Sequence, residues 1–109
     1  GGMSGGGRIA SIAATTFPQW FDGALYLAGA DYFGQAEPAR LAAIAANLYV
    51  FLTGDKDFNR REMRQVHQRY RKAGVPQTLL LDLPHFAHHY PGANDLERAL
   101  AFLDGGAER

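Results

Sequence analysis

Three short runs of almost wholly apolar residues constrain the fold of this chain more than any other feature. They cover residues 24–29, 48–53 and 77–83, and turn-forming or polar residues flank each of them. Runs of this length and composition are typical of strands covered on both faces, as in a parallel sheet. Because helical segments separate the runs, the pattern predicts an α/β fold with at least three parallel strands and flanking helices.

The clearest helical segment begins after Asn59, a suitable N-cap residue. Met63, Val66, His67 and Tyr70 follow at the i, i+3, i+4 and i+7 positions of one helix face. Gly74 and Pro76 then end the helix. The other expected helices lie at residues 8–14, at residues 38–45 with a first-turn proline, and from an Asn94–Glu97 capping box to Gly105-Gly106, with Leu96, Leu100, Leu103 and Ala99 buried.

Length and composition exclude several classes of protein. The chain has 109 residues, which fits one domain or part of one, and its 11 basic and 11 acidic residues balance. A neutral chain offers no global attraction for nucleic acid or an anionic membrane. It contains no cysteine and no run of apolar residues long enough to span a membrane. No signal peptide is visible, so the localisation stays open, with the cytoplasm favoured.

The first residues, Gly2-Met3-Ser4-Gly5-Gly6, fit the pattern G-x-S-x-G. This pattern is typical of a nucleophile elbow, a tight strand-to-helix turn that holds a serine hydroxyl clear of the backbone. We expect glycine on both sides because a Cβ there would collide with the neighbouring turn. The alternative interpretation is a flexible glycine-rich tail, such as the remnant of an expression tag.

Three polar side chains follow strand ends in the predicted sheet. Ser4 would follow a strand that enters the elbow, Asp57 follows the second apolar run, and His88 follows the third. Working residues of such sheets gather beyond the carboxyl ends of the strands. We therefore expect these three residues to converge at one edge of the sheet.

Four segments of the sequence resemble the C-terminal half of an α/β-hydrolase of the bacterial serine esterase or polyhydroxybutyrate-depolymerase-like kind. They are residues 2–8 around the elbow, residues 21–29, residues 50–57 with their G-x-x-D motif, and residues 84–88. With their connections they cover nearly the whole chain. The resemblance assigns the acidic role to Asp57 rather than Asp55, and the histidine role to His88 rather than His85 or His89.

The resemblance implies a serine hydrolase that cleaves carboxylic esters through a Ser4–Asp57–His88 triad and an acyl-enzyme. His88 would act as the base, Asp57 would orient its imidazole, and the backbone N–H of Gly5 would be one donor of the oxyanion hole. The expected substrate is a small-molecule or polymeric ester. No metal or organic cofactor is implied.

The residue types also permit interpretations without catalysis. Asp55 and Asp57 are suitable turn residues before a capped helix, and His85, His88 and His89 form a histidine-rich loop that lacks the usual zinc spacings. The arginine-rich face of the helix after Asn59 is expected to be solvated rather than to bind nucleic acid.

The resemblance also implies missing parts. The strand that enters the elbow and the loop that gives the second oxyanion donor are absent from this sequence, as in a fragment, a late-called reading frame or a natural half-domain. The strand at residues 24–29 would then be an open apolar edge that pairs with the missing N-terminal half or a second copy. We expect the isolated chain to be a weak catalyst or inactive. The alternative function is a non-catalytic fragment or assembly module.

Overall fold

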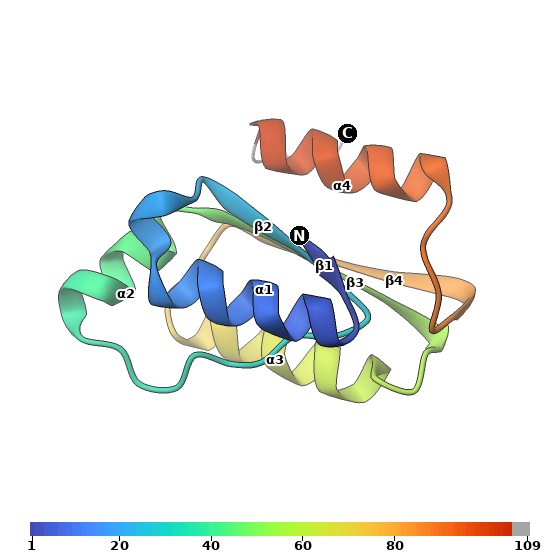
Figure 1. Cartoon of the computed structure of the whole chain (residues 1–109), viewed down its shortest axis with the longest axis horizontal. Helices are drawn as coiled ribbons and strands as arrows, with labels where there is room; N and C mark the ends of the chain where they lie inside the picture. The colour runs from blue at the N-terminus through green and yellow to red at the C-terminus, as the bar shows by residue number, and fades with distance from the viewer. Residues whose placement is uncertain (106–109) are drawn as a thin grey trace.

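The computed structural model describes residues 1–105, which form a four-stranded parallel sheet flanked by helices (Figure 1). The chain alternates strand and helix throughout. Its elements are β1 (Gly2–Met3), α1 (Gly5–Thr16), the 3-10 helix η1 (Pro18–Trp20), β2 (Gly23–Leu27), α2 (Pro38–Ala45), β3 (Leu48–Lys56), α3 (Arg60–Lys72), β4 (Thr78–Ala87) and α4 (Ala93–Gly105).

The strands lie side by side in chain order, β1-β2-β3-β4, and each neighbouring pair is parallel. Right-handed crossovers that always step in the same direction place their helices on the same face of the sheet. Accordingly, α1 and α3 cover one face, while α4 crosses the opposite face after the last strand (Figure 1). This confirms the predicted α/β class and adds a fourth strand to the three predicted from the apolar runs.

Each face of the sheet has its own core. Under α1 and α3 the core is aromatic, and the hydroxyls of the buried Tyr26 and Tyr70 hydrogen-bond at 3.1 Å. Under α4 the core is aliphatic, with Val50 and Leu52 of β3 packed near Phe102. Successive residues of a strand point to opposite faces. A strand between two such cores is therefore apolar at every position, which is the pattern that predicted β3.

The helices α1 and α3 bury the faces expected from the sequence. Small residues of α1, among them Gly7 and Ser11, lie against the sheet and allow close packing. Met63, Val66 and Tyr70 of α3 are buried, and His67 is half-buried on the same face. Asn59 precedes α3, but its side chain does not cap the helix. Its amide instead donates to the carbonyl of Ala28 at 2.8 Å, which joins the end of β2 to the start of α3.

The prediction for α4 was partly wrong. The helix begins at Ala93, so Asn94 lies inside it rather than at the N-cap. Its buried residues are Ala99 and Phe102, whereas Leu100 is 54% exposed. Leu96 and Leu103 are half-buried. The bulky Phe102 lies three positions after Ala99, and this stripe faces the sheet in place of the leucine stripe. The predicted stop includes Gly106, which lies outside the described residues.

Two further expectations need correction at the sheet edges. The edge of β2 is covered only in part, because Gly2 and Met3 of β1 pair with Tyr26 and Leu27, and no described strand pairs with residues 23–25 on that side. At the other edge, β4 continues to Ala87 through the segment expected to be a loop. It does so across a register shift opposite Gly54–Lys56. An edge strand tolerates a proline such as Pro84 because the missing N–H can face away from the ladder.

Candidate active site

Ser4 occupies a sharp turn between β1 and α1. Its backbone has φ 54° and ψ −117°, a conformation that residues with a side chain rarely adopt. Its N–H donates to the carbonyl of Leu27 at 2.6 Å, and its own carbonyl accepts from the N–H of Arg8 at 3.0 Å. The turn is therefore fixed to both the sheet and the helix. The side chain makes no capping bond to α1, which leaves the hydroxyl for other partners.

The glycines around Ser4 divide into required and replaceable ones. A Cβ on Gly2 would run into the backbone of Gly6, and a Cβ on Gly7 would run into the carbonyl of Gly29. A Cβ on Gly6 would meet nothing within 4 Å. The expectation of a tightly packed glycine on both sides of the serine is thus met at Gly2 and wrong at Gly6. The close approach of α1 to the end of β2 instead requires Gly7.

His88 follows β4 directly and lies between the other two predicted residues. Its Nε2 is 2.7 Å from the Oγ of Ser4, and its Nδ1 is 2.9 Å from the Oδ1 of Asp57. The three residues lie far apart in the chain, and the carboxyl ends of parallel strands bring them together. With a proton on Nδ1, the ring donates to Asp57 and its Nε2 accepts from the Ser4 hydroxyl.

Asp57 is held in a fixed orientation inside the protein. Its side chain is fully buried, and Oδ2 accepts from the hydroxyl of Thr53 at 2.7 Å. Its Oδ1 accepts from the backbone N–H of Asn59 at 3.0 Å as well as facing His88. Asp57 thus also organises the turn into α3, as the non-catalytic interpretation expected. A buried carboxylate requires such partners, because an unpaired charge in the interior is costly.

Asp55 has a different environment, although it lies only two residues from Asp57. It is exposed and faces away from this cluster, toward the backbone of residues 85 and 86. The backbone N–H of His85 lowers the pKa of its carboxyl group. The aspartate that lies beside His88 and Ser4 is therefore Asp57, the one that the family resemblance selected.

Two residues of the site were missed by sequence reasoning. Thr53 is completely buried and binds the carboxylate of Asp57. The ring of Phe58 lies tilted against the imidazole of His88, with ring centroids 4.1 Å apart and an interplanar angle of 33°. Thr53 is a polar residue at the end of an apolar run, four residues before Asp57. This position could have predicted that its hydroxyl lies near the carboxylate. No sequence signal distinguishes Phe58 from an ordinary surface aromatic.

The other histidines of the loop do not join this cluster. His85 is exposed, while the ring of His89 packs on Phe86 and its Nδ1 lies 2.7 Å from the carbonyl of Tyr90. Within residues 1–105, no group of three or more His, Asp or Glu side chains is arranged to hold a metal ion.

Gly5 begins α1 immediately after Ser4. The first N–H groups of a helix have no partner within the helix, and the helix dipole makes this end favourable for negative charge. A Cβ at Gly5 would meet nothing within 4 Å, so the space around it is open. Gly5 is thus suited to donate to an oxyanion that forms next to Ser4.

None of the helices described over residues 1–105 is long and apolar enough to cross a membrane. The sequence matches no protein-family model, and no curated protein resembles it at a significant level.

Proposed function

We propose that this chain is the catalytic C-terminal half of an α/β-hydrolase-type serine hydrolase that cleaves carboxylic esters. The observation that carries the proposal is the pair of contacts made by His88, 2.7 Å to Ser4 and 2.9 Å to Asp57. A serine hydroxyl is a weak nucleophile until a neighbouring base takes its proton. An imidazole between the hydroxyl and a buried carboxylate has the arrangement needed for that transfer.

In the first half of the reaction, the Oγ of Ser4 attacks the carbonyl carbon of the ester. The Nε2 of His88 takes the hydroxyl proton, and Asp57 stabilises the positive charge on the ring. The tetrahedral intermediate then collapses and breaks the bond to the alcohol oxygen. His88 returns its proton to that oxygen, so the alcohol leaves and the acyl group remains on Ser4.

In the second half, water replaces the serine as the nucleophile. His88 takes a proton from the water as it attacks the acyl carbonyl, and the intermediate collapses with return of the proton to the Oγ of Ser4. The products are a carboxylic acid and the free enzyme. These steps call for no metal and no organic cofactor. Substrates are small-molecule or polymeric esters whose carbonyl reaches Ser4.

The negative charge on the carbonyl oxygen during both halves needs hydrogen-bond donors. The N–H of Gly5 supplies one at the positive end of α1. α/β-Hydrolases take a second donor from a loop that precedes the elbow in their sequence. Loss of one oxyanion donor typically lowers turnover by about 10²- to 10³-fold. We therefore expect the chain to hydrolyse esters slowly unless a partner segment supplies that donor.

A non-catalytic assembly module is the second candidate, and the surface of α1 favours it. Ile9 and Ile12 of this helix are 69% and 54% exposed, although both are large apolar residues. Such residues outside a core mark a surface that a partner covers. Under the hydrolase proposal the same surface receives the N-terminal half of the domain or a second copy, which would also pair along the outer edge of β1.

Turnover of p-nitrophenyl butyrate distinguishes the two candidates. The assay compares the chain alone with the chain extended by the sequence that its gene encodes upstream of Gly1. We expect the extended protein to be faster, and Ser4→Ala to lower its kcat by about 10³-fold or more. If the folded, extended protein hydrolyses the ester equally well with and without Ser4, the hydrolase proposal is wrong.

A further inference from the structure

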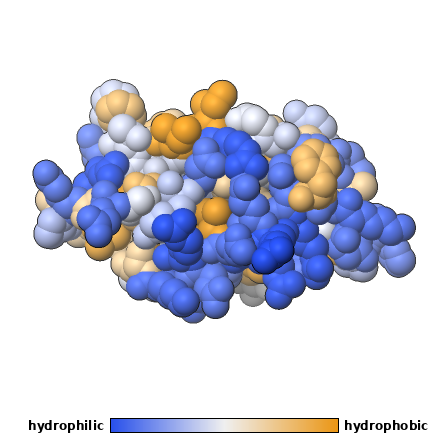
Figure 2. Space-filling model, turned by 90° about the horizontal axis from the view of Figure 1, so that it is seen from below, coloured by the Kyte–Doolittle hydropathy of each residue, from blue (hydrophilic) through white to orange (hydrophobic). Residues whose placement is uncertain are grey.

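The positive charge of this neutral chain is concentrated on α3. This helix carries six of the chain's 11 lysines and arginines and only one acidic residue, Glu62. The side of the molecule formed by α1, α2 and α3 is correspondingly mostly hydrophilic at its surface (Figure 2). Some of this charge is already neutralised or shielded, since Arg60 pairs with Asp82 and Arg69 lies 4.0 Å from the ring centre of Tyr32. No ion pair is recorded for Arg61, Arg64, Arg71 or Lys72 in the part of the chain that the structure describes.

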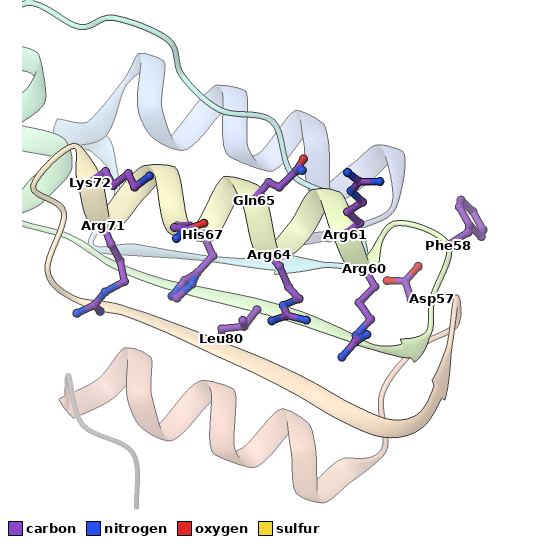
Figure 3. A pocket seen from close by; sticks show the side chains of 11 residues that line it. Asp57, Phe58, Arg60, Arg61, Arg64, Gln65, His67, Arg71, Lys72 and Leu80 are labelled. Atoms are coloured by element: carbon purple, nitrogen blue, oxygen red, sulfur yellow. The ribbon is translucent and has the colours of Figure 1, made fainter.

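Side chains of α3 line an open hollow of about 990 Å³ that runs along the helix from Asp57 and Phe58 to Lys72 and includes Leu80 of β4. We call the part of it that faces β4 the α3–β4 groove and define it by Arg60, Arg64, His67 and Arg71 on the helix and Leu80 on the strand. These helix side chains point toward β4, whereas Arg61, Gln65 and Lys72 point away from it (Figure 3). The two ends are tied to the strand, because Arg60 binds Asp82 at 2.9 Å and Arg71 reaches the Thr78 hydroxyl at 3.4 Å.

The floor of the groove borders an open strand edge. β4 pairs with β3 on one side, and no strand described within residues 1–105 pairs with its other side. The helix α4 packs on the face of the sheet opposite α3, where Ala99 and Phe102 share a cluster with residues of β3 and β4. An open edge presents unpaired backbone N–H and C=O groups that accept a further strand. Thr78, Leu80 and Asp82 alternate along β4 on the side that faces α3.

One buried polar atom in the groove also lacks a partner. The Nε2 of His67 is shielded from solvent and makes no hydrogen bond to the described residues. It lies between Arg64 and Arg71 in the row along the helix (Figure 3). Because this nitrogen is shielded, a bound segment would contact the arginines beside it rather than the imidazole.

We propose that the α3–β4 groove binds an extended acidic segment of a partner protein, which adds to β4 as a fifth strand. Its backbone pairs with the open edge, and every second side chain faces α3. Acidic residues on that side bind Arg64 and Arg71. This function is separate from ester hydrolysis and does not depend on Ser4.

Arg64 and Arg71 lie seven residues apart on α3, about 10.5 Å along the helix axis. Side chains on one face of a strand lie about 6.6 Å apart, and every second one of them about 13 Å apart. The long arginine side chains span this difference, so one extended segment can bind both. Guanidinium groups bind carboxylates through two hydrogen bonds, which gives arginine an advantage over lysine here.

The positive charge of α3 and the open edge of β4 together favour an acidic peptide over a second copy of the chain or a nucleic acid. A second copy that paired through β4 about a two-fold axis perpendicular to the sheet would place two α3 arginine rows side by side, and like charges repel. A nucleic acid would match the charge, but it has no backbone that can continue a sheet. An acidic peptide satisfies both the arginines and the edge.

Binding of a fluorescent peptide of about eight residues with alternating Glu and Val tests the proposal by anisotropy on the full chain. The comparison peptide alternates Glu and Pro, which keeps the charge but removes every second N–H and fixes φ at about −65°, away from the strand conformation. We expect the Glu–Val peptide to bind at least about tenfold more tightly. Arg64→Gln should weaken its binding about two- to fivefold, and adding Arg71→Gln about tenfold in all.

Arg61→Gln is the matched control, because Arg61 lies on the same helix but points away from β4 (Figure 3). It should change binding less than twofold. Equal binding of the Glu–Pro peptide or of a short single-stranded DNA would overturn the proposal in favour of a non-specific polyanion surface. Equal effects of Arg61→Gln and Arg64→Gln would overturn it too. Self-association of the chain that Arg64→Gln abolishes would indicate a second copy as the occupant and overturn the proposal. The absence of any binding of the Glu–Val peptide to the folded chain would also overturn it.

Discussion

At the residue scale, Phe58 is the least expected member of the site. It is 77% exposed, yet its ring lies 4.1 Å from that of His88. It contributes little to the core, so its packing role is confined to the imidazole. A ring over this face restricts rotation of His88 and interacts favourably with the cation that forms during proton transfer.

Replacing Phe58 by alanine should therefore slow the reaction of Ser4 without unfolding the protein. An aromatic contact of this kind contributes about 0.5–1.5 kcal/mol, which corresponds to about a two- to tenfold lower rate of labelling by a fluorophosphonate. Phe58→Tyr should keep the wild-type rate, since it preserves the aromatic ring. An unchanged rate in Phe58→Ala, measured on samples with the same unfolding midpoint, would show that the contact has no role.

The three main site residues were predictable because each follows a strand. Ser4 lies in a recognisable motif, and Asp57 and His88 follow apolar runs whose ends a parallel sheet aligns. The choice of Asp57 over Asp55 came from the family resemblance and not from the sheet. Phe58 was not predictable, because its role depends on the direction of one side chain after a turn.

At the scale of single elements, the packing of α1 depends on one glycine more than on its neighbour. The backbone of Gly7 approaches the carbonyl of Gly29 so closely that a methyl group has no room there. The position of Gly6 one residue earlier is open. The two glycines are in the same helical turn, so they form a matched pair.

Gly7→Ala should lower the free energy of unfolding by about 1–3 kcal/mol, because the helix must move away from the sheet. Gly6→Ala should raise it by about 0.5–1 kcal/mol through reduced flexibility of the unfolded chain. Urea unfolding of both variants gives the comparison. Equal effects of the two substitutions would contradict the packing described for α1.

The pH dependence of stability should report on His67 in α3. Burial lowers the pKa of its imidazole from the usual 6.5, and the charge of Arg71 lowers it further. The unfolded chain therefore binds a proton at this residue more readily than the folded chain does. Its contribution to stability is complete above about pH 6.5 and is lost as the pH falls toward the folded-state pKa.

His67→Phe should accordingly reduce the loss of stability between pH 7.5 and pH 5.5, measured as the free energy of unfolding in urea. Phenylalanine retains the edge contact that the imidazole makes with the ring of Phe51, at 5.4 Å between centroids. If wild type and His67→Phe lose the same free energy over this range, the imidazole of His67 is not the group responsible.

The elements differ in how far the sequence determined them. Strand β3 and helix α3 were predictable because their apolar patterns are regular. β3 is apolar at almost every position, and the apolar residues of α3 recur on one helix face. The buried face of α4 was not, because Leu100 and Phe102 are both apolar and only the shape of the sheet selects between them. The extension of β4 beyond Pro84 depends on the register shift against β3, which leaves no local signal.

At the scale of the whole molecule, two helices differ in surface character. Helix α1 exposes the apolar side chains of Ile9 and Ile12, and α3 carries six of the 11 lysines and arginines. Helix α3 is also tied to α1 through Glu62, which pairs with Arg8 just after the elbow.

Replacing Ile9 and Ile12 by glutamine should change the free energy of unfolding by less than about 0.5 kcal/mol, because neither side chain belongs to the core. The same double substitution should lower any concentration-dependent self-association in sedimentation experiments. Self-association that is unaffected, together with a large loss of stability, would contradict an exposed apolar surface on α1.

The most direct test of the central claim is to find which residue a fluorophosphonate modifies. After prolonged incubation of the folded chain, peptide mass spectrometry should locate the adduct on Ser4. Labelling should be lost in Ser4→Ala and much slower in His88→Ala, because the hydroxyl then lacks the base 2.7 Å away. An adduct on another residue, or labelling of Ser4 at the same rate with and without His88, would contradict the account.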